Sequence, residues 1–100
     1  MMEQEKDAEK KLRKAIERQG GAFLKFISPG NDGVPDRVAL LPDGRIIFVE
    51  LKKKTGRLSP IQKFQIAKFR RLGQSVRVVY GLEGVEELLA ELHDGKEVMP

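Results

Sequence analysis

The chain has 100 residues, 40% apolar and 34% charged, an ordinary globular composition with room for one hydrophobic core, so we expect a single domain over residues 1–100. The absence of cysteine excludes disulfides, thiolate zinc sites and cysteine nucleophiles, and fits a reducing compartment. Lysine and arginine outnumber aspartate and glutamate by 19 to 15, and this net charge of +4 favours a polyanionic partner, although solvated surface alone can produce it.

Hydrophobic spacing and turn-forming residues predict seven elements in the order α-β-β-β-α-β-α. A helix over 3–19 carries an apolar stripe and ends at two glycines, and a strand over 22–27 follows. After a loop at 28–34, two strands over 36–41 and 45–52 flank the turn 42–44. A helix over 59–72 begins with serine and proline, a valine-rich strand covers 75–80, and a last amphipathic helix closes near Gly95.

The order of these elements indicates an α/β fold with a mixed sheet flanked by helices. The strand, helix and strand between 45 and 80 predict a right-handed parallel crossover, whereas the preceding strand pairs antiparallel through its short turn. No apolar run is long enough to span a bilayer, and the segment 1–6 is too polar for a signal peptide. We therefore expect a cytoplasmic protein with no membrane contact.

The proline-aspartate-glycine turn predicts which residues of its two strands face each other. It is typical of a three-residue hairpin loop, so Leu41 faces Arg45. Counting back along both strands places Asp36 opposite Glu50, with side chains on the same face of the sheet. Lys52 lies on that face too, because strand side chains alternate.

Two carboxylates placed together repel each other, and burial increases that repulsion. A divalent cation such as Mg²⁺ or Mn²⁺ relieves it, and Lys52 beside the pair can hold a water or offset charge on a reacting phosphate. The alternative is that Asp36 is an acid of the loop before the strand and that Glu50 and Lys52 form an ion pair on the surface. The apolar run around Glu50 indicates a buried strand, which favours a catalytic site for phosphodiester hydrolysis.

Pro35-Asp36 followed by Glu50-Leu51-Lys52 at the end of an apolar strand resembles the PD-(D/E)XK nuclease superfamily, and most closely its virus-type replication-repair nuclease (VRR-NUC) branch. The resemblance runs from about residue 5 to residue 80. The other positions that carry it are Glu9, Gly20-Gly21, Lys25-Phe26, 28–30, 33–37, 48–52, 58–62 and Gly73.

This resemblance implies a restriction-endonuclease-like αβββαβ core and Mg²⁺- or Mn²⁺-dependent DNA cleavage. Asp36 and Glu50 would bind the metal with help from the Leu51 carbonyl, and Lys52 would assist the attacking water. For the helix acid that completes the family's metal site, the pattern favours Glu9, with Glu5 as the alternative because it lies nearer the apolar stripe.

Stand-alone short members of the family resemble Holliday junction resolvases, which implies a homodimer that acts on branched or four-way DNA. This chain looks like such a stand-alone member, of phage or prophage origin. The alternative is a non-catalytic nucleic-acid-binding module that keeps the nuclease fold. Intact Asp36, Glu50 and Lys52 argue against that alternative, since binding alone needs no paired carboxylates.

Five further residues are candidates for DNA contact, each with a structural alternative. They are Lys25, Lys53, Lys54, Arg57 and Gln62. Lys25 can reach a phosphate or extend to solvent, and the other basic residues can be solvated loop charges. Gln62 can orient the active-site lysine, contact DNA or close a capping box. Arg37 is expected in an ion pair or on DNA, and Phe64 and Phe69 in the core.

Overall fold

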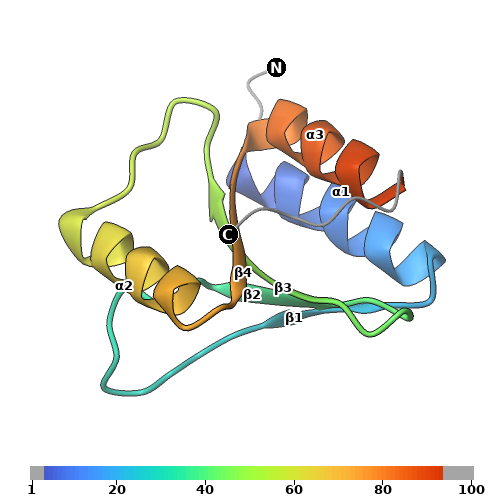
Figure 1. Ribbon diagram of the computed structural model, residues 1–100. Helices are drawn as coiled ribbons and strands as arrows, with labels where there is room; N and C mark the ends of the chain where they lie inside the picture. Colours follow the sequence, from blue (N-terminus) through green and yellow to red (C-terminus); the bar gives the residue numbers. More distant parts are fainter. Residues whose placement is uncertain (1–3, 94–100) are drawn as a thin grey trace.

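The computed structural model describes residues 4–93 and has the predicted order of elements (Figure 1). The elements are α1 (Glu5–Arg18), β1 (Ala22–Lys25), β2 (Arg37–Leu40), β3 (Ile46–Lys52), α2 (Pro60–Arg71), β4 (Ser75–Tyr80) and α3 (Gly81–His93). The end predicted near Gly95 lies outside the described residues. No helix in the described part of the chain is long and apolar enough to cross a membrane.

The four strands form one mixed sheet in the order β1-β2-β3-β4. The pairs β1–β2 and β2–β3 are antiparallel, and β3–β4 is parallel across the crossover through α2. Helices α1 and α3 cover one face of the sheet and α2 lies on the other (Figure 1). This arrangement confirms the predicted α/β class with a mixed sheet between helical layers.

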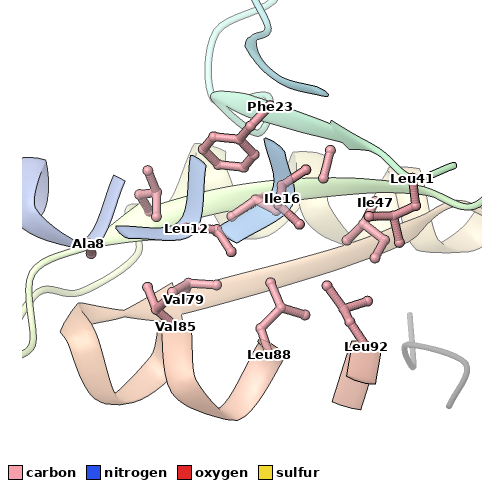
Figure 2. Close-up of a cluster of buried hydrophobic side chains, with 13 residues drawn as sticks. Ala8, Leu12, Ile16, Phe23, Leu41, Ile47, Val79, Val85, Leu88 and Leu92 are labelled. Atoms are coloured by element: carbon pink, nitrogen blue, oxygen red, sulfur yellow. The ribbon is translucent and has the colours of Figure 1, made fainter. Parts of the chain in front are cut away.

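The main hydrophobic core fills the space between the sheet and the α1–α3 layer (Figure 2). Leu12 and Ile16 of α1, at helical spacing, meet inward-facing strand residues and the apolar stripe of α3. The buried members are Ala8, Leu12, Ile16, Phe23, Ala39, Leu41, Ile47, Val49, Leu51, Val79, Val85, Leu88 and Leu92. Every second residue of β3 from Ile47 to Leu51 belongs to this core, so Glu50 faces the opposite side of the sheet.

A smaller aromatic cluster packs between the sheet and α2. The rings of Phe26, Phe48 and Phe69 meet edge to face, with centroid separations between 5.0 and 6.3 Å. Phe64, predicted in the core, is instead 58% exposed. It lies five residues before Phe69 and therefore about 140° away around the helix, so it cannot share the face that meets the sheet.

The hairpin between β2 and β3 has the predicted register. Leu41 N–H donates to the Arg45 carbonyl at 2.9 Å, and Gly44, in the left-handed region with φ +93°, donates to the Leu41 carbonyl at 3.0 Å. The strand pairing runs back to Arg37 opposite Val49. One further step in the same register places Asp36, just before β2, beside Glu50.

The loop that leads to Asp36 is held against the first turn of α2. Gly33 has φ +85°, and a Cβ at that position would lie 2.7 Å from the Ile61 carbonyl oxygen, so only glycine fits there. Gln65 of α2 is buried and donates its side-chain N–H to the Asp32 carbonyl at 3.2 Å. These contacts fix the position of Asp36 relative to α2.

Candidate active site

Asp36 and Glu50 lie together at the end of β3, as the hairpin register predicts. Asp36 Oδ1 accepts a hydrogen bond from the backbone N–H of Leu51 at 3.3 Å, which ties the aspartate to the strand that carries the glutamate. The Asp36 side chain is 39% exposed, whereas Glu50 is only 4% exposed. One carboxylate thus faces solvent and the other is buried beside it.

The Glu50 carboxyl group is buried with incomplete hydrogen bonding. Oε2 accepts a long hydrogen bond of 3.4 Å from Gln62 Nε2, and Oε1 has no hydrogen-bond partner among the described residues. Burial, followed by the charge of Asp36, raises the pKa of Glu50 to about 7. The positive charge of Lys52 opposes this rise, so the carboxyl group is poised between its neutral and charged forms near neutral pH.

Lys52 ends β3 on the face that carries Glu50. It lies opposite Tyr80 of the parallel strand β4 and is only partly exposed. Strand alternation places Lys52 on the side of the sheet that carries Glu50, as predicted, and its positive charge acts to lower the pKa of Glu50. Lys53 and Lys54 follow it as exposed residues of the loop toward α2, and Arg57 is exposed farther along.

Gln62 closes the predicted capping box and makes one contact that the sequence did not predict. Its backbone N–H donates to Ser59 Oγ at 3.2 Å and its Oε1 accepts from the Ser59 N–H at 2.9 Å, so the capping box is formed. The remaining amide N–H group points to Glu50 rather than to the lysine. The start of α2 therefore orients the buried carboxylate.

Glu5 and Glu9 of α1 have different surroundings. After burial and the charge of Asp36, the negative charge of Glu5 also contributes to the raised pKa of Glu50. Glu9 accepts a hydrogen bond from Arg13, one turn along the same helix, at 2.9 Å. A sequence signal for Glu5 exists: it continues the stripe of Ala8 and Leu12 toward the helix N-terminus.

The two basic residues predicted near the pair behave differently. Lys25 is exposed on the edge strand β1, opposite Arg37, and so belongs to the sheet face away from Glu50. Arg37 Nη1 donates to the Asp36 carbonyl oxygen at 3.0 Å and lies 3.6 Å from Asp36 Oδ2. The sequence predicts that Arg37 forms an ion pair or contacts DNA, and the structure shows the ion pair with Asp36.

Comparison with known proteins decides the family. The model of the VRR-NUC domain matches residues 2–83, which is most of the chain. The chain belongs to the VRR-NUC family. A solved VRR-NUC domain structure superposes with a TM-score of 0.78 at 31% identity, covering 86% of this chain and 94% of its own. "Putative nuclease p44" of Acyrthosiphon pisum secondary endosymbiont phage 1 is 43% identical over 75 residues, which are 75% of this chain and 81% of that protein.

The VRR-NUC assignment makes this chain a nuclease domain, with DNA as the implied substrate and a divalent metal ion as the cofactor that the family suggests. Within the described residues, no group of three or more acidic or histidine side chains is close enough to form a metal cage. Two carboxylates nevertheless suit Mg²⁺, which keeps several waters and binds through one or two protein carboxylates. The buried Glu50 Oε1, with no partner of its own, fits such an ion.

The raised pKa of Glu50 predicts how the metal-free VRR-NUC domain responds to pH. The folded state holds the Glu50 proton up to about pH 7, whereas the unfolded chain releases it near 4.5. The unfolded state therefore binds fewer protons between these values, so the free energy of unfolding falls as pH rises, by roughly 3 kcal/mol at most. Chemical denaturation in EDTA from pH 4.5 to 8 measures this loss. Glu50→Gln should remove it, and an equal pH slope in both proteins would contradict the assignment.

The placement of Glu5 and Glu9 on one helix provides a matched pair of substitutions. Glu5→Gln removes a negative charge that acts on Glu50, so the metal concentration for half-maximal DNA cleavage should rise about tenfold. Glu9→Gln removes only the charge that pairs with Arg13 and should leave that concentration nearly unchanged. Metal titrations of cleavage by both variants decide the matter. A larger effect at Glu9 would support the sequence-based preference for Glu9 instead.

Proposed function

We propose that this VRR-NUC domain is a Mg²⁺- or Mn²⁺-dependent endodeoxyribonuclease that hydrolyses phosphodiester bonds, with a preference for four-way junctions or other branched DNA. The observation that supports it best is the buried Glu50 carboxylate, which has an unpartnered oxygen and lies beside Asp36. When both carboxylates are charged they repel each other, and a cation bound between them relieves that repulsion.

Each residue of the site has a distinct role in this proposal. Asp36 and Glu50 would hold the metal with the Leu51 carbonyl, and Gln62 keeps Glu50 in position through its amide N–H. The metal, when bound, lowers the pKa of a water and stabilises negative charge on the phosphate. Lys52 places a mobile positive charge beside the pair, where it can hold the attacking water or compensate charge on the phosphate oxygens.

Basic residues around the site supply the DNA contacts in this proposal. Lys53, Lys54 and Arg57 are exposed on the loop that leaves β3, next to Lys52. Their charges bind the phosphate backbone, which aligns a strand with the carboxylate pair and makes binding dependent on salt. Lys25, exposed on β1, would contact the backbone farther from the metal.

The proposed substrate also favours a homodimer. Each chain has one such site, whereas resolution of a four-way junction requires two symmetric cuts. A C₂ dimer supplies two centres related by the same symmetry as the junction. Sedimentation of the protein with junction DNA at micromolar concentration should show two chains per junction, and a purely monomeric species would contradict the dimer.

The test of the proposed function compares two labelled substrates of matched sequence, a four-way junction and a linear duplex, in Mg²⁺, Mn²⁺ and EDTA. We expect internal cleavage of the junction with either metal, slower cleavage of the duplex, and none in EDTA. Cleavage in EDTA would contradict metal dependence, and equal rates on both substrates would contradict branch selectivity. Junction binding without cleavage under every condition would support the non-catalytic module instead.

A further inference from the structure

Arg37 lies behind the carboxylate pair, on the other face of the sheet. In the strand register it is opposite Val49, which is fully buried under the α1–α3 layer, whereas Asp36 and Glu50 belong to the alternate row. The Arg37 side chain is only 18% exposed, yet its guanidinium reaches back to the Asp36 carbonyl and carboxylate. A largely buried arginine thus contacts one of the two acids from the side away from solvent.

The partners of the four carboxylate oxygens differ in kind. Asp36 Oδ1 accepts a backbone N–H, Glu50 Oε2 accepts an amide N–H from Gln62, and Glu50 Oε1 has no partner among the described residues. Asp36 Oδ2 is 3.6 Å from the Arg37 guanidinium. Among the contacts described here for the four oxygens, Arg37 provides the positively charged partner.

We propose that Arg37 is the resident counter-ion of Asp36 in the metal-free domain, and that it sets the concentration of divalent metal needed to fill the site. This inference rests on the proposed metal-dependent function. A metal ion that binds Asp36 must either displace the guanidinium or share the carboxylate with a second positive charge. In both cases Arg37 weakens metal binding while it stabilises the empty site.

The chemistry of arginine suits this role. Its guanidinium stays charged at every physiological pH, so the compensation of Asp36 does not vary with conditions, and its several N–H groups allow simultaneous contact with the carbonyl and the carboxylate. The contact length of 3.6 Å indicates a moderate rather than a strong ion pair. A moderate pair holds Asp36 in place without preventing a divalent ion from replacing it.

The test measures Mn²⁺ binding to the whole chain, without DNA, by isothermal titration calorimetry. Arg37→Gln removes the charge but keeps a hydrogen-bond donor, and Arg37→Lys keeps the charge. The matched control is Arg45→Gln, which removes an arginine paired with Asp43 at 2.8 Å at the opposite end of the same hairpin. Denaturation midpoints of each metal-free variant confirm that it is folded.

We expect Arg37→Gln to bind Mn²⁺ about fivefold more tightly than the wild type, a size typical of one partly exposed ion pair. Arg37→Lys and Arg45→Gln should bind as the wild type does. A merely structural role would weaken binding, so unchanged or weaker Mn²⁺ binding by Arg37→Gln would overturn the inference. Binding by Arg37→Lys as tight as that of Arg37→Gln would also overturn it, because the lysine keeps the charge. If the wild type binds no Mn²⁺, the proposed metal-dependent function itself fails, and the inference falls with it.

Discussion

Asp36→Asn and Glu50→Gln should each lower the rate of DNA cleavage by roughly a thousandfold or more, the effect of losing several kcal/mol of metal-derived stabilisation in the transition state. Each change removes one anionic ligand and leaves the size of the side chain almost the same. DNA affinity should change little, because the basic residues supply it and neither acid contacts the phosphate backbone directly in the proposal.

Single-turnover cleavage of the junction at saturating protein, beside a binding titration in Ca²⁺ or EDTA, separates the two effects. Asp43→Asn is the matched control, since Asp43 lies in the turn at the other end of the hairpin and pairs with Arg45. It should cut at the wild-type rate. Wild-type rates in either active-site variant would show that the carboxylate pair is not the catalytic centre.

The second large effect is expected at Lys52. Lys52→Ala should slow single-turnover cleavage roughly a hundredfold, because a positioned ammonium acts mainly on the charge that develops in the transition state. Its loss should barely weaken DNA binding, since it is one of 19 basic residues. Lys53→Ala and Lys54→Ala should instead weaken DNA binding and leave the rate at saturating protein nearly normal. The slope of log affinity against log salt concentration should become shallower by about one in each variant.

These three neighbours test the strand register as well as the chemistry. Lys52 is the last residue of β3 on the face of Glu50, whereas Lys53 and Lys54 are exposed beyond the strand. Cleavage rates and salt titrations for all three variants give the comparison. Equal losses of rate at Lys52 and Lys53 would mean that Lys52 has no special position beside the carboxylate pair.

The parts of the structure that could be predicted from sequence are those that depend on local signals. The turn between β2 and β3 contains glycine where a left-handed residue is required, and this alone sets the register that brings Asp36 to Glu50. Likewise Ser59 and Gln62 mark the start of α2 through a capping box that lies within four residues. The order of elements follows from similarly local patterns.

The wrong prediction for Phe64 and the open choice of helix acid both concern how helices dock on the sheet, which no local pattern determines. Phe64 is exposed, whereas α2 buries Gln65 and Ile66 and places Phe69 against Phe48 of β3. The choice between Glu5 and Glu9 depends on the rotation of α1 over β3, which tertiary packing sets. The contact of Gln62 with Glu50 is not among the predicted roles, because it also depends on how α2 docks on the sheet.

The most direct test of the account is the position of a metal ion in the protein itself. Crystals soaked in MnCl₂ and measured at the manganese absorption edge give an anomalous difference map that locates Mn²⁺ independently of any activity. The account predicts a peak between the carboxylates of Asp36 and Glu50, on the side of the unpartnered Glu50 Oε1. No peak at that position, with both side chains ordered, would contradict it.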